Sequence, residues 1–584
     1  MTTPAGKKGS SLQTNDASRA FLATLAQWTG GLSPQAFGGA WFNVLSRLAI
    51  APGRQVELAR TALQKSLALA QFTGTALRGG APAPEAAGTP YAHRFSDPAW
   101  SKFPFNVLAQ SFIAASDLAR EAVRNVPGAD AAAENIAGFT VREGLELLAP
   151  DNYLPTNPQL IQKTVEENGR NLLRGAKHLA EDVQRTLRGL GPVGVEQYEV
   201  GKQVASTPGK VVLRTPLMEL IQYSPQTKTV FAEPVLIVPA WIMKYYILDL
   251  SPKNSLVNYL TGLGHTVFMI SWKNPTAEDR DVTMDDYLTQ GLHAALEAVT
   301  TIVPKRKVHA VGYCIGGTLL SIAASELAGK DDDRLASVTM FAAQTDFSEP
   351  GELSIFISPA QLAMLEAMMW KEGVLESRQM GGAFQLLRTY DLLWAPSIAT
   401  YLRGERTGVN DLMSWNADGT RMAYRMHTDY LHQLYLNNDL AEGRYVARGE
   451  QISLSDITVP MFVVGTETDH VAPWRSVYKV GRLVRSADFT FCLTSGGHNA
   501  GIISGPQHPK RRHRVHTSRS GSRQLSPDKY LEKVQPTPGS WWPTWAKWLE
   551  ERSSARKVAP PAMGAPKKGI KPLCAAPGTY VLQK

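Results

Sequence analysis

Cys314, Asp469 and His498 have the residue types and the chain order that acyl transfer by a nucleophile, an acid and a base requires. Cys314 lies in the run GYCIGG, a G-x-C-x-G pattern that places cysteine where a nucleophile elbow carries serine. The β-branched run KVHAV precedes it and the helix-forming run GTLL follows it, so we expect a strand, a sharp turn and a helix. The N-terminus of such a helix favours a thiolate, and the alternative is a buried structural cysteine.

The acid and the base each follow a strand-like run. Asp469 comes after MFVVG, and His498 comes after FTFCLTSGG on a glycine-rich turn. Two competitors stay open, because Asp346 ends its own strand-like run and His470 is the neighbour of Asp469. Cys492 lies inside a strand-like run with no base beside it, which indicates packing.

The same architecture needs two backbone donors for an oxyanion. One is expected at Ile315, the residue after the nucleophile, and the other in the loop after VLIVPA, with Ile242 as the candidate. The alternative reading of these positions is an ordinary turn between a strand and a helix.

A cysteine nucleophile suits a thioester substrate. A thiol that attacks an acyl thioester forms another thioester, so the acyl group stays activated toward a second acceptor. That acceptor is expected to be a hydroxyl deprotonated by His498, and water competes with it. A cap that excludes water therefore decides between a transferase and a hydrolase.

Short strand-like and helical runs alternate from residue 190 onward, which predicts an α/β fold with a mainly parallel sheet. The alternation stops at about residues 348–455, a Trp-, Met- and Tyr-rich helical stretch that we expect to form the cap. Residues 1–189 carry helical spacing and are expected to form an all-helical N-terminal domain, with residues 1–18 disordered.

Composition narrows the class of protein. The 584 residues include 43% hydrophobic and 19% charged residues, as in ordinary globular proteins. The 3 cysteines fit neither a disulfide framework nor a metal site, so we expect a reducing compartment, no metal and no cofactor. The N-terminus lacks a signal-peptide core and no run of eighteen apolar residues occurs, so a cytoplasmic protein without a membrane span is expected.

The net charge of +9 is partly local. Six basic residues fall within residues 510–523, namely Lys510, Arg511, Arg512, Arg514, Arg519 and Arg523. No aromatic residues are interleaved for base stacking, so nucleic-acid binding is not expected. A solvated loop is the favoured interpretation of this stretch, and attraction to an anionic ligand or surface is the alternative.

The chain resembles the polyhydroxyalkanoate synthases, most closely the single-polypeptide class I type. The matching blocks are FSDPAWSKFPFN, NYLPTNPQLIQKTVEENGRNLLRG, PAWIMKYYILDLSPKNSLV, SWKNP, GYCIGG, DFSEPGEL, LMSWNADGT, DHVAPW, GGHNAG and GSWWPTWAKWL. They span nearly the whole length. The basic stretch of residues 510–523 departs from these blocks.

The resemblance implies an α/β-hydrolase core with a cap, in which Cys314 carries the acyl group, His498 is the base and Asp469 is its partner. It also implies (R)-3-hydroxyacyl-CoA substrates, with a growing polyester and free CoA as products. It further implies that the helical domain takes part in dimerisation and in association with polyester granules. The expected location is therefore the cytoplasm, at these granules. Cap positions singled out by the family blocks are Trp415, Tyr435 and Asn438. Cap arginines that could meet CoA phosphates are Arg403, Arg406 and Arg421.

Two other functions use the same features. A hydrolase, either a thioesterase or an enzyme similar to dienelactone hydrolase, would use the same triad and pass the acyl group to water. A non-catalytic protein of the granule surface would bind polyester through the N-terminal helices. The intact order of the triad argues against the second alternative.

Overall fold

The chain folds into two compact units, and the computed structural model describes residues 16–80, 82–519 and 524–584. The α/β unit contains residues 16–32, 196–379 and 410–584, and the helical unit contains residues 33–195 and 380–409. Most of the stretch expected to be disordered, residues 1–15, lies outside the described residues. Its last three residues, 16–18, begin a helix.

Within the described residues, eleven strands form one sheet in the order β14-β13-β12-β11-β6-β5-β3-β4-β2-β1-β15. The six central strands are parallel, which is the mainly parallel sheet that the sequence predicts. The strands are β1 (Gly209–Arg214), β2 (Met218–Tyr223), β3 (Val235–Val238), β4 (Val267–Trp272), β5 (Val308–Tyr313), β6 (Leu335–Phe341), β11 (Met461–Thr466), β12 (Asp488–Thr494), β13 (Arg512–Arg519), β14 (Thr537–Pro538) and β15 (Cys574–Ala575). Because β3, β5 and β11 are buried along their whole length, their runs are largely apolar rather than alternating, with His309 as a buried polar exception in β5.

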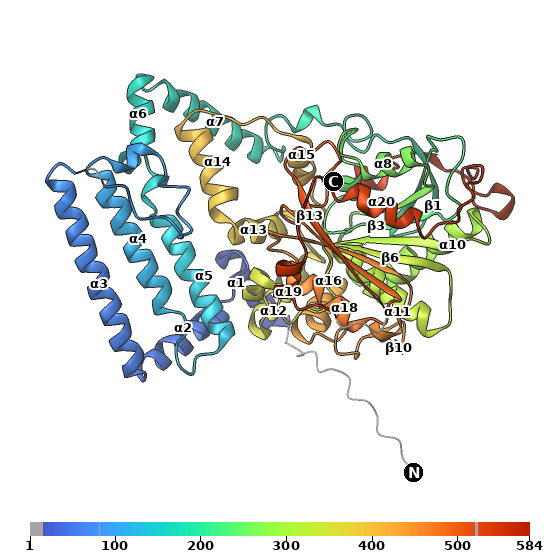
Figure 1. The fold of residues 1–584 in the computed structure, drawn as a ribbon, viewed down its shortest axis with the longest axis horizontal. Helices are drawn as coiled ribbons and strands as arrows, with labels where there is room; N and C mark the ends of the chain where they lie inside the picture. The colour runs from blue at the N-terminus through green and yellow to red at the C-terminus, as the bar shows by residue number, and fades with distance from the viewer. Residues whose placement is uncertain (1–15, 81, 520–523) are drawn as a thin grey trace, which may run out of the picture. The chain divides into compact units, whose positions relative to one another are not determined.

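Helices cover both faces of this sheet, as Figure 1 shows for the α/β unit. On one face α8 (Leu256–Leu263) and α20 (Trp542–Glu550) share a single hydrophobic cluster with the sheet. Three of its largest buried side chains, Trp541, Trp542 and Trp545, come from the α20 region. Helix α11 (Ile315–Gly329) packs against β5 and β6, and α17 (Trp474–Tyr478) packs against β11.

The remaining elements of the α/β unit lie between the main strands and in the cap region. The helices are α1 (Asp16–Thr29), α9 (Met284–Asp286), α10 (Ala294–Ile302), α12 (Pro359–Glu372), α15 (Asp411–Ala417), α16 (Tyr424–Tyr430), α18 (Val480–Leu483) and α19 (Pro527–Lys533). The short strands are β7 (Val374–Leu375), β8 (Met422–Ala423), β9 (Val446–Ala447) and β10 (Glu450–Gln451). A wide turn of π-helix, Leu431–Leu436, continues α16.

The helical unit consists of two stretches of the chain. Its helices are α2 (Pro34–Ala49), α3 (Pro52–Leu77), α4 (Phe105–Ala122), α5 (Ala131–Leu148), α6 (Pro158–Glu166), α7 (Arg170–Leu187), most of α13 (Ser377–Leu387) and α14 (Ala395–Ser397). Hydrogen bonds join the second stretch to α7, because the Tyr401 hydroxyl donates to Asp182 over 3.1 Å and Arg406 donates to the same carboxylate over 2.8 Å.

The two units divide the chain differently from the expected boundary at residue 189. Helix α1 groups with the α/β unit, where it packs on α12, and Gln361 Nε2 donates to the Gly31 carbonyl over 2.6 Å. Residues 380–409, expected in the cap, group with the helical unit. Helical periodicity identifies such segments as helices, but it carries no information about their distant packing partners.

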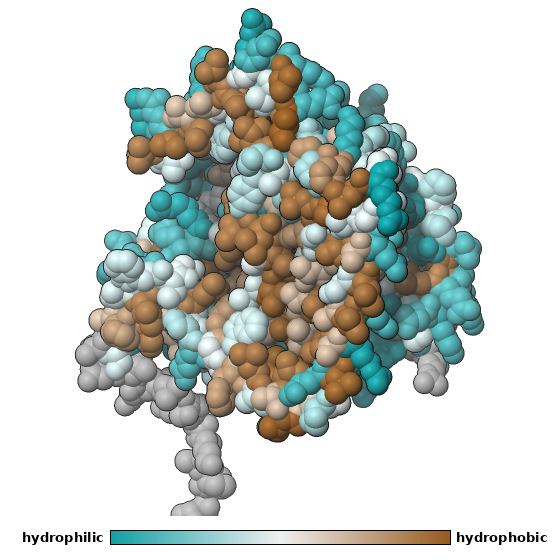
Figure 2. Space-filling view, turned by 90° about the vertical axis from the view of Figure 1, so that its left-hand side faces the viewer, coloured by the Kyte–Doolittle hydropathy of each residue, from teal (hydrophilic) through white to brown (hydrophobic). Residues whose placement is uncertain are grey.

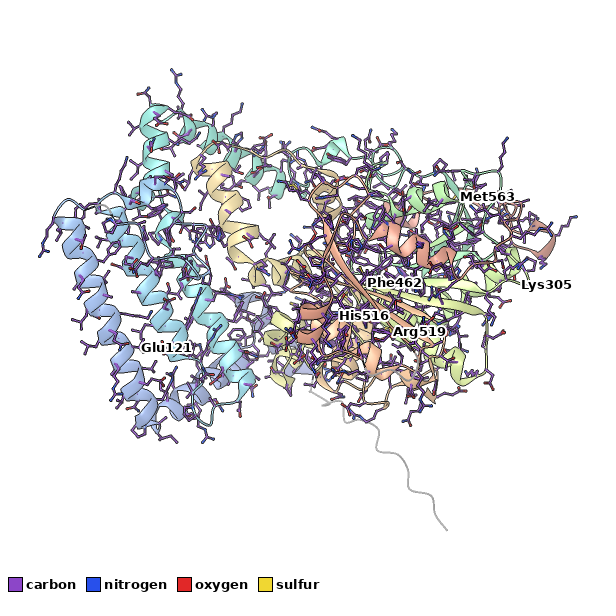
Figure 3. The ribbon with its side chains drawn as sticks, in the orientation of Figure 1. Glu121, Lys305, Phe462, His516, Arg519 and Met563 are labelled. Carbon is purple, nitrogen blue, oxygen red and sulfur yellow. The ribbon has the colours of Figure 1, made fainter. Side chains whose placement is uncertain are left out.

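The basic stretch contains a strand rather than only a loop, so the expectation of a solvated loop was wrong for residues 512–519. Strand β13 pairs with β12 in antiparallel register, from Thr494↔His513 to Asp488↔Arg519, and Figure 3 labels His516 and Arg519 on it. His513 is buried and bonds the Gly539 carbonyl at 3.0 Å. Arg512 pairs with Glu467 at 2.7 Å. On its other side β13 pairs with the two-residue strand β14 at Arg512 and His513. Charged side chains are common near the edge of a sheet because they discourage pairing with other chains, and that charge hid the strand signal here. Residues 520–523, with Arg523, lie outside the described residues.

In the described part of the chain, none of the helices combines the length and the apolar character needed to span a membrane.

Candidate active site

Cys314 lies on the tight turn between β5 and α11. Its backbone has φ 54° and ψ −129°, a region that a non-glycine residue adopts only under strain, and its N–H donates to the Phe341 carbonyl over 2.9 Å. The glycines on either side allow the turn to form. A Cβ at Gly316 would overlap the carbonyl oxygens of Val238 and Pro239, so only glycine fits the close approach of α11 to the end of β3.

The Gly316→Ala variant is therefore expected to lose stability and activity together. The added methyl group would overlap the backbone at the end of β3, so α11 must shift. We expect the free energy of unfolding to fall by about 1–3 kcal/mol. The urea midpoint of unfolding measures this change. Gly329→Ala is the matched control, because it lies at the end of the same helix and a Cβ there meets only Asp456 Oδ2 at 3.9 Å. An unchanged midpoint for Gly316→Ala would contradict the argument.

Asp469 and His498 form a buried pair beyond the carboxyl ends of β11 and β12. His498 Nδ1 donates to Asp469 Oδ2 over 2.8 Å, and the Thr466 hydroxyl donates to the same oxygen over 2.9 Å. The other oxygen of Asp469 accepts the backbone N–H groups of Val471 at 2.9 Å and Ala472 at 2.8 Å. The Asp469 side chain is 0% exposed and that of His498 is 10% exposed. The carboxylate is thus fully paired and fixes the orientation of the imidazole.

Electrostatics in this pair favour an imidazolium next to a carboxylate. Burial opposes the charge on His498, yet the Asp469 carboxylate, which is hydrogen-bonded to the ring, and the negative charge at Cys314 hold the pKa of His498 well above its ordinary value. Burial likewise disfavours the charged carboxylate, but the His498 charge and the hydrogen bonds to the carboxylate hold the pKa of Asp469 below its ordinary value. A cysteine on a tight turn and a buried histidine–carboxylate pair are the groups that acyl transfer by a nucleophile, a base and an orienting acid would need.

The competing residues make other contacts. Asp346 accepts the backbone N–H of Ser348 at 2.9 Å and the side-chain amide of Asn438 at 3.3 Å. His470 follows the acid in the chain, but the ring that Asp469 holds is that of His498. Cys492 is fully buried in β12, and this burial raises the pKa of its thiol strongly, which suits a packing role.

The two oxyanion candidates lie on neighbouring turns. The Ile315 N–H is in the first turn of α11, where no carbonyl of the same helix can accept it. Ile242 lies in the loop of residues 239–244, which we call the β3 loop. Cap residues fasten this loop, because the Thr420 hydroxyl donates to the Trp241 carbonyl over 2.7 Å and Met243 forms a bridge to Gly419.

The three cap candidates have different surroundings. Trp415 belongs to the hydrophobic cluster against which Cys314 packs, and its indole N–H donates to the Lys244 carbonyl over 2.7 Å. Asn438 accepts the Phe347 N–H at 2.8 Å and so fixes the loop after β6. Burial raises the pKa of the Tyr435 hydroxyl, and negative charge at Cys314 adds to that shift.

Three further aromatic residues near the nucleophile were not singled out from the sequence. The Tyr435 ring packs on Phe347 at 4.6 Å and on Tyr430 at 5.4 Å. Burial raises the pKa of the Tyr430 hydroxyl well above its ordinary value, and negative charge at Tyr435 and Cys314 adds to that shift. The Tyr313 ring lies 5.6 Å from the His498 ring, and its hydroxyl donates to Asn499 over 2.5 Å. Tyr313 lies inside GYCIGG and Phe347 inside DFSEPGEL, which was the available signal for these two, and Tyr430 lies five residues before Tyr435.

All three arginines considered for CoA phosphates make contacts within their own unit. Arg406 pairs with Glu181 at 2.7 Å and also with Asp182, and Arg421 donates to the Pro275 carbonyl over 3.1 Å. Arg403 donates to Gln159 over 3.1 Å and lines a cavity of about 290 Å³ in the helical unit.

Models of three protein families match the chain. They are the N-terminus of poly-beta-hydroxybutyrate polymerase (PhaC) over residues 91–260, a second poly-beta-hydroxybutyrate polymerase N-terminal model over residues 13–54, and the alpha/beta hydrolase fold over residues 233–503. The last match agrees with the α/β-hydrolase fold expected from the sequence.

Characterised relatives extend the similarity over most of the chain. The poly(3-hydroxyalkanoate) polymerase of Methylorubrum extorquens is 38% identical over 90% of this chain and 86% of the relative. The polymerase subunit PhaC of Rhizobium etli is 37% identical over 88% of this chain and 80% of the relative. The polymerase subunit PhaC of Cupriavidus necator is 33% identical over 86% of this chain and 84% of the relative. The resemblance noted from the sequence is thereby confirmed, and the chain belongs to the poly(3-hydroxyalkanoate) polymerases, a family of acyltransferases.

Proposed function

We propose that this chain polymerises (R)-3-hydroxyacyl-CoA thioesters into a polyester and releases CoA, with Cys314 carrying the acyl group. The observation that carries the proposal is the buried hydrogen bond between His498 and Asp469, together with Cys314 on the strained turn before α11, in a chain whose relatives are polymerases. The site holds a nucleophile, a base and an acid, which is what acyl transfer needs.

In the first step the Cys314 thiolate attacks the thioester carbonyl carbon of the substrate. The carbonyl oxygen takes up the negative charge, and the N–H groups of Ile315 and Ile242 stabilise it. The bond to the CoA sulfur then breaks, and the His498 imidazolium gives its proton to the departing thiolate. The products are free CoA and an acyl-cysteine thioester of nearly the same energy as the substrate.

In the second step the hydroxyl of another hydroxyacyl group attacks the acyl-cysteine. Neutral His498 takes the hydroxyl proton, an ester bond forms, and the Cys314 thiolate leaves. Each cycle therefore lengthens the polyester by one ester bond. Asp469 stays ionised throughout and stabilises the imidazolium.

The surroundings of Cys314 favour transfer over hydrolysis. The rings of Tyr430, Tyr435 and Phe347 pack on one another close to the nucleophile, and Trp415 contributes to the cluster beside it. Apolar side chains at this point disfavour water as the acceptor. The polyester end, which is bulky and apolar, is the better match.

Incubation of the purified protein with 3-hydroxybutyryl-CoA tests the proposal. We expect free CoA, measured with a thiol reagent, together with insoluble polymer, measured by turbidity and by methanolysis of the precipitate. A thioesterase would release the same CoA but leave soluble 3-hydroxybutyrate. Release of CoA without polymer would therefore replace the polymerase by the hydrolase alternative.

The helical unit is the part that would contact the granule or a second copy of the chain. Helix α3 exposes an apolar stripe at helical spacing, formed by Val56, Leu63, Leu67 and Leu77. Figure 2 views the helical unit from this side and shows apolar residues gathered on its surface. An apolar surface of this kind fits association with an apolar polyester or self-association.

A further inference from the structure

Residues 579–584, which we call the C-terminal segment, are held firmly against β2. The carboxylate of Glu219, fully buried in β2, accepts the backbone N–H groups of Thr579 at 2.8 Å and Tyr580 at 2.9 Å. The Arg214 guanidinium pairs with the same carboxylate at 2.5 Å. The Tyr580 hydroxyl donates to the Thr215 carbonyl over 2.8 Å. The segment therefore has a fixed course beside the end of β1 and the start of β2.

Beyond this anchor the C-terminal segment reaches the β3 loop. Lys244 is only 3% exposed, and its ammonium donates to the Gln583 carbonyl over 2.5 Å. The side-chain oxygen of Gln583 accepts the Asn274 N–H at 3.0 Å. A buried ammonium without an acceptor would be costly, so the Gln583 carbonyl allows Lys244 to stay where it is.

The same segment also reaches the cap residues that fasten the β3 loop. The Lys584 ammonium pairs with Asp418 at 2.7 Å, and Arg421 donates to the Lys584 carbonyl over 3.0 Å. The other oxygen of Asp418 accepts the Tyr246 hydroxyl at 2.9 Å. The loop thus lies between the cap on one side and the C-terminal segment on the other.

We infer that the C-terminal segment is a positioning element of the active site, which holds the β3 loop so that its backbone donor at Ile242 meets the oxyanion. The inference rests on the proposed function, because it concerns the acylation of Cys314 by a thioester. It assigns no contact with substrate to the segment itself. Lys244, Gln583 and Lys584 act through the loop, two residues away from the donor in the case of Lys244.

The charged groups around Lys244 belong to the two elements that hold the β3 loop. Burial lowers the pKa of Lys244 to about 8, Asp418 opposes the shift, and Lys584 and Arg421 add to it. The charged groups that face Lys244 thus come from the cap and from the C-terminal segment. If the C-terminal segment moves away, the ammonium loses the Gln583 carbonyl that accepts its hydrogen bond, and the loop that carries Lys244 becomes free to move.

Two variants test the inference, each made in the full chain. Lys244→Met removes the ammonium, and the double variant Gln583→Ala with Lys584→Met removes the contacts to Asn274 and Asp418. Lys584 is 80% exposed, so the double variant is expected to fold even if Lys244→Met does not. Lys567→Met, an exposed lysine of the same C-terminal region, is the matched control.

Two rates are measured for each variant. The first is the single-turnover release of CoA from 3-hydroxybutyryl-CoA, which needs the oxyanion donors. The second is alkylation of Cys314 by iodoacetamide, followed by mass spectrometry of the Cys314 peptide, in which no oxyanion forms. We expect acylation to fall about ten- to hundredfold in both variants, as small misplacements of catalytic groups do. Alkylation should keep the wild-type rate, and Lys567→Met should change neither rate.

Unchanged acylation in the double variant would overturn the inference. A parallel fall of acylation and alkylation would also overturn it, because that pattern means damage to the whole site rather than to the oxyanion donor. Failure of the proposed function is a separate result, since the wild-type protein itself would then form no polymer.

Discussion

Replacement of Cys314 by alanine is expected to abolish both CoA release and polymer formation. The acyl group then has no sulfur to bond to, and the second step has no acyl-cysteine to consume. Loss of one member of a triad removes most of its catalysis, so we expect turnover to fall at least about a thousandfold. The measurement is CoA release and polymer yield from 3-hydroxybutyryl-CoA. The thermal transition should stay close to that of the wild type, because the thiol is only partly buried.

Two variants sharpen this result. Cys574→Ala changes another partly buried cysteine, in β15, and is expected to keep wild-type activity. Cys314→Ser keeps the shape of the elbow but replaces the thiolate by a hydroxyl, which is a poor match for thioester exchange, so a severe loss is expected. Retained activity in Cys314→Ala would remove this residue from the mechanism. Normal polymer yield in Cys314→Ser would show that sulfur is not required.

The second large effect is expected from Asp469→Asn. An amide at this position cannot stabilise the imidazolium, and it favours the wrong tautomer of His498. We expect kcat to fall by about 10³–10⁴, as in other triads with this change. The stepwise rates of acylation and of chain transfer should both decline, because His498 moves a proton in each of them.

Asp346→Asn is the control for the acid. Asp346 follows a strand as Asp469 does, but its contacts run to Ser348 and Asn438 rather than to His498. We expect this variant to keep most of the activity. If it lost as much as Asp469→Asn, the assignment of the acid would have to change.

Stability should also depend on pH through this pair. The pKa of His498 is raised in the folded state, so its contribution is complete below its ordinary value of 6.5 and is lost as the pH rises through the elevated pKa. The pKa of Asp469 is lowered, so its contribution is complete above its ordinary value of 3.8 and is lost as the pH falls. The difference in urea midpoint between the wild type and Asp469→Asn should therefore be largest between these two values and shrink on both sides.

The central part of the fold was predictable because its signals are local. The alternation of buried strands and helices is visible in the sequence, and the elbow, the acid and the base follow one another in a fixed order. The distance between His498 and Asp469 then follows from the parallel pairing of β11 with β12, which places both residues beyond the same edge of the sheet.

Long-range packing explains what could not be predicted. Strand β13 carries so many charges that its pairing with β12 left no apolar alternation to recognise. The docking of α1 on α12 joins helices more than three hundred residues apart, as the Gly31–Gln361 contact shows. The rings of Tyr430 and Phe347 meet near Cys314 only because the cap folds back over the loop after β6.

The way the two units share the chain limits how the protein can be divided. The chain passes from one unit to the other after residues 32, 195, 379 and 409, so no single cut separates them. A truncation that removes residues 1–189 would take away α7, against which residues 380–409 are hydrogen-bonded, and would strip α1 from α12. Fragments cut at the boundary expected after residue 189 would thus expose surfaces inside each piece, and residues 190–584 alone would lack contacts that both units make in the full chain.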